Sequence, residues 1–227
     1  MDLVYTIKRS IKRRNLTICV ERDRTVVVHA PAGMADEKIR QVVESKRQWV
    51  YEKIGHPQKY QMIPHAPGKE LVSGESALYL GRQYRIEVVN TALPGVEFAQ
   101  RFLISATQKE KREEALREWY LRKAKEKIIP RVKRHAGEIG VDAAEIKIVD
   151  SLYRWGSCTV KDNVNFNWRL IKAPMFVVDY VIVHELAHLM EANHTPRFWN
   201  IVRTQAPTMD KAKAWLKEHG QLLEQAI

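Results

Sequence analysis

The segment from Met175 to Met190 constrains the fold most strongly, because its apolar residues point in every direction around a helix axis. It contains neither Gly nor Pro, and Pro174 before it suits a first helical position. A helix that is apolar on all sides is normally buried at the centre of a domain. The sequence therefore predicts a buried central helix over this segment.

The C-terminal part of this helix carries two histidines and a glutamate, in the motif His184-Glu185-Leu-Ala-His188. Residues four apart stand one above the other on a helix, so both imidazoles can reach a single zinc ion. Burying these polar groups is costly unless a metal pairs with them. Glu185 can then face an open coordination position and take a proton from water. The motif predicts a zinc site with Glu185 as general base.

A catalytic zinc usually has three protein ligands, and His194 is the first candidate for the third. Asn193 and the Thr-Pro pair after His194 mark the end of one helix and the start of another, which places His194 in a tight corner. The H-E-x-x-H-x5-H spacing equals that of metzincins, although those have Gly where this chain has Glu191. A carboxylate from a later helix is the alternative, either Glu218 or Asp210.

The residues around the motif resemble the YgjP-like metallopeptidases, a family related to the SprT-like zinc proteases. The matching segments are Tyr153–Cys158, Val164–Leu170, Asp179–Leu189 and Asn193–Trp199, with looser matches at Val26–Pro31 and Leu80–Arg85. The resemblance implies a zincin-type fold, zinc at His184, His188 and His194, and Glu185 as general base. The chain does not depart from the family at any of these four positions.

Amide hydrolysis also requires a group that stabilises the oxyanion. The polar candidates in the matching segments are Tyr153, Arg154, Asn167 and Arg197, and the sequence does not choose among them. Strands are predicted at Glu145–Asp150, Arg154–Val160 and Val164–Trp168, the last two forming a hairpin. If Trp155–Cys158 is an edge strand, an extended substrate can add to it, and Gly156 permits a close backbone approach. An interior strand that needs Gly for packing is the equal alternative.

Together these elements predict an α+β fold with two domains. Residues 106–227 form a zincin-like catalytic domain with a small antiparallel sheet, the buried motif helix and C-terminal helices. Residues 1–105 form an N-terminal β-rich module with one helix, Asp36–Ile54. A long helix from about Gln108 to Ala136 opens the catalytic domain, and Pro130 should kink or break it.

The net charge of +11 would attract nucleic acid or acidic proteins. Five of the seven residues from Lys8 to Arg14 are cations, but those of the long helix alternate with glutamates, as on an ordinary solvated helix. No nucleic-acid-binding module is recognisable, so this partner is expected from charge alone.

Two cysteines make no disulfide framework, and neither a signal peptide nor a membrane span is found, which indicates the cytoplasm. Cys19 falls in a strand pattern and is interpreted as a packing residue. Cys158 is interpreted as a small buried residue, with a position near the metal as the alternative. His29 is assigned no function.

The favoured function is zinc-dependent hydrolysis of protein or peptide substrates. Two other classes fit the same motif. A non-catalytic zinc protein would use its basic surface to hold nucleic acid or a protein partner, and its site would need a fourth ligand, for which Cys158 is the nearby candidate. A zinc hydrolase of a non-peptide bond is the other class, because the motif does not define the substrate.

Overall fold

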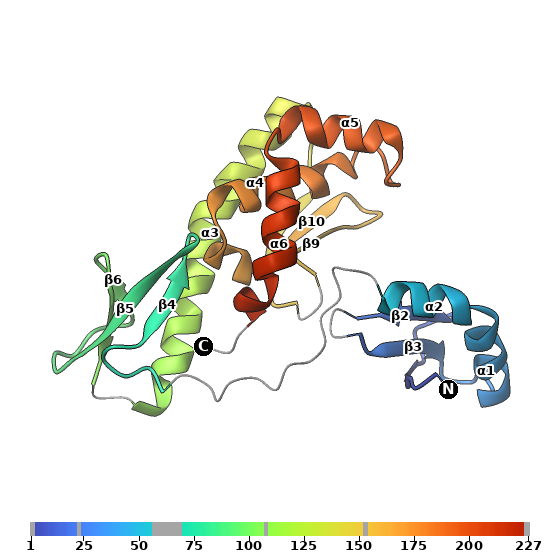
Figure 1. The fold of residues 1–227 in the computed structure, drawn as a ribbon, viewed down its shortest axis with the longest axis horizontal. Coiled ribbons are helices and arrows are strands. Elements are labelled where there is room, and N and C mark those ends of the chain that lie inside the picture. Colours follow the sequence, from blue (N-terminus) through green and yellow to red (C-terminus); the bar gives the residue numbers. More distant parts are fainter. Residues whose placement is uncertain (1–2, 22–23, 56–69, 107–108, 152–153, 225–227) are drawn as a thin grey trace. The chain divides into compact units, whose positions relative to one another are not determined.

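The structure, a computed structural model, describes residues 3–21, 24–55, 70–106, 109–151 and 154–224 (Figure 1). It divides into two compact units, Met1–His65 and Ala66–Ile227. The described residues contain six α-helices and small sheets, so the fold is α+β, as predicted. None of the described helices is both long and apolar enough to cross a membrane.

The first unit is a three-stranded sheet with two helices. Its strands are β1 (Thr6–Ser10), β2 (Thr17–Val20) and β3 (Val26–Pro31), in the order β1-β3-β2. β1 runs parallel to β3, and β2 runs antiparallel to it. Val28 and Ala30 of β3 form a small core with Ile39 and Val43 of α1 (Asp36–Ser45). The face of the sheet that carries Val28 and Ala30 therefore packs on α1.

The single helix expected over 36–54 is two helices, α1 and α2 (Arg47–Ile54). Lys46 between them has φ −106° and ψ 11°, outside helical geometry, and its N–H donates to Val43 O instead of continuing the α pattern. The Ser45 hydroxyl donates to Val42 O at 2.8 Å. This local competition for carbonyl groups explains the interruption.

The second unit is built around the long helix α3 (Arg112–Ile139) (Figure 1). Before it come β4 (Ser76–Tyr79), β5 (Arg82–Val89), β6 (Glu97–Phe98), β7 (Phe102–Ser105) and the 3-10 turn η1 (Lys109–Lys111). After it come β8 (Glu145–Val149), β9 (Gly156–Cys158), β10 (Asn163–Asn167), the 3-10 segment η2 (Trp168–Lys172), α4 (Met175–Ala187), α5 (Pro196–Gln205) and α6 (Met209–Glu224). The sequence predicted that Pro130 would either kink or break this helix. It does not break it, because α3 continues through Pro130 to Ile139.

The sheet β4-β5-β7-β6 packs on α3 through aromatic rings. The ring centroid of Phe102 lies 4.9 Å from that of Trp119, and Tyr79 lies 5.0 Å from Trp119. The Tyr120 hydroxyl donates to Leu78 O at 2.7 Å. These contacts place β4–β7 in the same compact unit as α3, whereas the sequence grouped residues up to 105 with the N-terminal module.

The second sheet of this unit, β8-β10-β9, is mixed. β9 pairs antiparallel with β10, as expected, but β8 pairs with β10 in parallel, so the prediction of an antiparallel sheet is wrong for β8. The reason is that β10 inserts between the two earlier strands, and the chain from β8 must cross its end to reach β9. Asn167 holds that crossing by donating to Ser151 O at 2.6 Å and Arg154 O at 3.1 Å.

α4 is the buried central helix. Val177, Val178, Ile182 and Val183 are each 0% exposed, and the helix contacts α3, α5, α6 and β9. Its start is held by the β4–β5 turn, where Gly81 has φ +80° and lies so close to Pro174 that a Cβ would come within 2.5 Å of Pro174 Cγ. The apolar run of the sequence thus folds as the helix that α3, α5, α6 and β9 cover.

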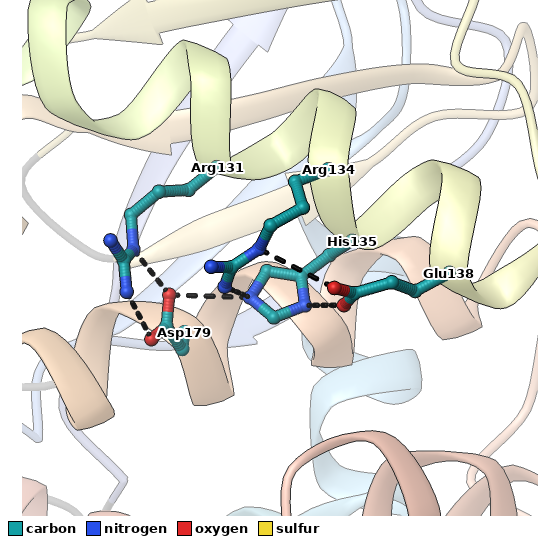
Figure 2. Close-up of polar contacts among 5 residues, drawn as sticks. All are labelled: Arg131, Arg134, His135, Glu138 and Asp179. Atoms are coloured by element: carbon teal, nitrogen blue, oxygen red, sulfur yellow. Dashed lines mark hydrogen bonds and ion pairs between the residues drawn. The ribbon is translucent and has the colours of Figure 1, made fainter.

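An ion pair ties α4 to α3 (Figure 2). Arg131 donates to both carboxylate oxygens of Asp179, at 2.7 and 2.8 Å, and His135 Nε2 lies 3.3 Å from Asp179 Oδ1. Partial burial alone would raise the pKa of Asp179, but the hydrogen bonds from Arg131 and His135 outweigh it and hold this pKa well below its usual range. Asp179 is therefore ionised in the folded protein and fixes the rotation of α4 against α3.

Replacing Asp179 with Asn should lower the free energy of unfolding by about 1–2 kcal/mol at pH 7, because charged hydrogen bonds are lost while the side-chain shape is kept. A depressed folded pKa stabilises the fold above the unfolded pKa, about 3.9, and that stability is lost as pH falls further. The difference from wild type should therefore shrink progressively below about pH 4. Urea unfolding measures both effects, with Asp142→Asn, at an exposed position, as the control. Equal stability of the Asp179 variant and wild type at pH 7 would contradict the assignment.

Candidate metal centre and active site

Three histidines converge at the C-terminal end of α4. His184 lies in the last turn of the helix, His188 is its C-cap, and His194 precedes α5 by two residues. One ring nitrogen of each lies within 4.8 Å of the others, and the Nε2 atoms of His184 and His194 are 3.1 Å apart. Two nitrogens bound to one tetrahedral zinc are separated by roughly 3.3 Å. The three rings therefore fit a metal ion of this size.

The protonation of these rings also suits metal binding. Burial, followed by repulsion from His188 and His194, lowers the pKa of His184 to about 3. Burial likewise lowers the pKa of His194. His188 Nδ1 lies 3.2 Å from Glu191 O, which orients the ring and leaves Nε2 for a ligand bond. Neutral imidazoles of this kind offer the lone pairs that a divalent ion requires.

Aromatic side chains of α5 hold the three rings in place. Phe198 is fully buried, and its ring centroid lies 4.5–5.0 Å from those of His184, His188 and His194. Trp199 stacks on His194, with centroids 5.4 Å apart and planes 21° from parallel. Sequence reasoning gave these two residues no role. Their position four and five residues after His194, on the helix that follows it, was the available signal.

Glu185 is directed towards the edge strand β9. Its carboxyl group lies against Gly156, where a Cβ atom would be 2.5 Å from Glu185 Cγ and 2.7 Å from Oε1. Burial raises the pKa of Glu185 to about 7, although the charge of Arg154 and a hydrogen bond from the Cys158 backbone oppose the rise. The Glu185 side chain is only 8% exposed, and its contacts with Gly156 and the Cys158 backbone fix its orientation. Sequence reasoning expected a close approach at Gly156, but by a backbone and not by this side chain.

β9 forms one edge of its sheet, because the strand order is β8-β10-β9. Thr159 N donates to Asn163 O, and Asn167 N donates to Trp155 O. By the alternation of an antiparallel ladder, Ser157 bonds to β10, whereas Gly156 and Cys158 turn their backbone groups away from it. The Cys158 N–H that bonds to Glu185 is one of these outward groups. The alternative of an interior strand does not describe β9.

The remaining predicted residues are scattered by the fold. Tyr153 lies outside the described residues. Arg154 is exposed and close enough for its charge to act on Glu185, and Arg197 is exposed in the first turn of α5. Asn167 is 2% exposed and uses its amide on backbone groups, including Arg169 N, so its geometry is that of a positioning residue.

The alternative metal ligands lie elsewhere. Glu218 and Asp210 are exposed on α6, and neither joins the three-histidine cluster among the described residues. The Cys158 sulfur is not part of that cluster either. Burial, with a further contribution from Glu185, raises the pKa of the Cys158 thiol, which keeps it protonated at neutral pH. The position and protonation of Cys158 therefore do not support it as a fourth ligand of the three-histidine site.

Comparison with known families agrees with the resemblance read from the motifs. The family model "YgjP-like, metallopeptidase domain" matches residues 14–219. The chain belongs to the YgjP-like metallopeptidase family. This protein is accordingly a metallopeptidase, an enzyme class that uses a metal ion to hydrolyse peptide bonds in protein or peptide substrates.

Two further comparisons add less. A search of curated proteins gives no match. Among solved structures, the crystal structure of the metallopeptidase zymogen of Pyrococcus abyssi abylysin is similar, with 16% sequence identity and a TM-score of 0.37. The match covers 44% of this chain and 99% of that chain.

Proposed function

We propose that this YgjP-like protein is a zinc-dependent peptidase of the zincin type. His184, His188 and His194 would hold the zinc ion, and Glu185 would be the general base. The observation that carries the proposal is the buried Glu185 carboxyl group, on the same helix as two of three histidines whose ring nitrogens lie within 4.8 Å of one another. A purely structural site has no use for a carboxylate held in this way.

The chemistry follows from what each group supplies. A bound zinc ion would lower the pKa of its water towards about 7 and polarise the scissile carbonyl. Glu185, which is buried, would accept the proton of the attacking water and pass it to the leaving amine. Arg154 and Arg197 are exposed near this end of the unit and are candidates for contact with the substrate or the oxyanion, together with Tyr153.

The substrate would lie along β9 as an added strand. Gly156 and Cys158 direct backbone groups away from β10, and Glu185 takes up the N–H of Cys158. An extended peptide can bond to the other outward groups without any requirement for a particular side chain. This mode favours unfolded or extended protein segments. A peptide-bound structure tests it, since a substrate bound away from β9 removes the idea.

Zinc content and turnover should depend on His194 and not on the later carboxylates. His194→Gln should lose peptide hydrolysis and one equivalent of zinc, because a ligand is removed, whereas Glu218→Gln should keep both. Metal analysis after dialysis, together with cleavage of a labelled unstructured protein, measures the two effects. A chelator should stop cleavage, and added zinc should restore it. If the Glu218 variant lost zinc and the His194 variant kept it, Glu218 would be the third ligand and His194 would not.

A further inference from the structure

A second set of metal-binding side chains lies in the first unit, whereas α4 belongs to the second. Cys19 is on β2, Glu21 follows the end of that strand, and His29 is on β3. The register pairs Thr17 with His29 and Cys19 with Val27, so Cys19 and His29 are diagonal neighbours on the same face of the sheet. Glu21 continues the alternation, because its N–H bonds to Thr25 O. All three side chains therefore project from the same face.

These side chains converge as well as share a face. One potential ligand atom from each of Cys19, Glu21 and His29 lies within 4.8 Å of the other two. All three residues are partly buried, and Val27, opposite Cys19 on that face, is 6% exposed. A partly dehydrated setting strengthens the attraction between a divalent cation and a thiolate or carboxylate. The geometry thus brings together three donors in a place where bound metal would be stabilised.

The donor types select the metal. A thiolate, an imidazole and a carboxylate are the three groups that bind zinc in proteins, whereas magnesium and calcium prefer oxygen ligands alone. The set also differs from that of the α4 site, which is all imidazole among the described residues. A metal held by Cys19 can therefore be recognised spectroscopically by its sulfur ligand.

The first unit is also the part of the chain that would benefit from a metal. It spans only Met1–His65, and its core cluster consists of Val28, Ala30, Ile39 and Val43 with partly buried neighbours. Modules of this size are commonly stabilised by disulfides or metal ions. Cys19 is the only cysteine of the unit, so an internal disulfide cannot form there. Of these two means of stabilisation, only a bound metal ion is open to the first unit.

We propose that the first unit binds a zinc ion through the Cys19 thiolate, the Glu21 carboxylate and the His29 ring, with water in the fourth position. Binding releases the thiol proton of Cys19 to solvent and links β2 to β3. Its ligands are distinct from those of the proposed catalytic metal, and the chemistry proposed for hydrolysis does not use it. It also gives a function to Cys19 and His29, which sequence reasoning treated as packing and as functionless.

Cobalt(II) substitution of the full-length protein tests this site directly. Metal-free wild type should bind two equivalents of cobalt and show the near-ultraviolet charge-transfer band of a cobalt–thiolate bond. Cys19→Ser should lose that band and bind one equivalent. Cys158→Ser should keep the band, as should a His188→Ala/His194→Ala double variant, which should bind only the equivalent held by the first unit.

Two further variants guard against misfolding of the cysteine variant. Glu21→Gln keeps the side-chain shape, and His29→Gln keeps a polar side chain of similar length. Each should weaken cobalt binding at the sulfur site at least 10-fold, since even the outer-shell partners of a metal ligand have effects of this order. Glu37→Gln, on the exposed first turn of α1, is the matched control and should change nothing. Peptide hydrolysis should be unaltered in all three. A wild type that binds one equivalent without a thiolate band, or a band that survives in Cys19→Ser, would overturn the proposal.

Discussion

Glu185→Gln should slow peptide hydrolysis by about 10²–10⁴-fold while the protein keeps its zinc, because the amide has the shape of the carboxyl group but cannot accept a proton. The effect should appear in kcat, since the proton transfer occurs in the transition state and not on binding. Metal analysis and steady-state cleavage of a labelled unstructured substrate measure the two quantities on the same preparation.

The control for this variant is Glu191→Gln. Glu191 contacts His188 through its backbone carbonyl and not through its side chain, so the substitution leaves the orientation of the ring unchanged. Its activity should equal that of wild type. Normal cleavage by Glu185→Gln would remove the general-base assignment, whereas loss of zinc in this variant would show that Glu185 supports the metal site instead.

Much of the candidate site could be predicted because its parts are local in sequence. His184 and His188 are related by helix geometry alone, and the apolar run that carries them has no other stable place than a core. The Thr-Pro half of the pattern around His194 is confirmed, because Thr195 caps α5 by accepting a hydrogen bond from Phe198 N. The Asn half is wrong, because α4 ends at Ala187 and Asn193 does not have a positive φ. Patterns of this kind need no knowledge of the rest of the fold.

Other features depend on contacts between distant segments and could not be predicted. Phe102 and Trp119 lie in different elements, β7 and α3, so no local sequence pattern relates them. Their packing nevertheless determines that β4–β7 belong with α3. The parallel pairing of β8 with β10 depends on which strand inserts between two others, which alternation does not specify. Asn167 was a candidate for substrate contact because of its type, but its burial under the β8–β9 crossing decides its role.

The contact between Gly156 and Glu185 belongs to the same class and leads to the second large effect. Gly156→Ala would place a Cβ atom 2.5 Å from Glu185 Cγ, 2.7 Å from Oε1 and 2.9 Å from Cδ, all closer than real Cβ contacts allow. Glu185 must then move, because it is the buried neighbour and the β9 backbone is held by its ladder with β10. A displacement of this size at a catalytic group costs about 10² in rate. Zinc binding should persist, since none of the three histidines is touched.

Gly137→Ala is the matched control, since nothing lies within 4 Å of a Cβ at that position in α3. It should keep full activity and raise the free energy of unfolding by roughly 0.5–1 kcal/mol through its better helix propensity. The combination of Gly156→Ala with Glu185→Gln separates the proposed cause from a general loss of structure. If the alanine acts by displacing the glutamate, the double variant should be no slower than Glu185→Gln alone, because the same proton transfer is lost only once. Multiplied losses in the double variant, or wild-type kcat in Gly156→Ala, would show that the contact does not position the base.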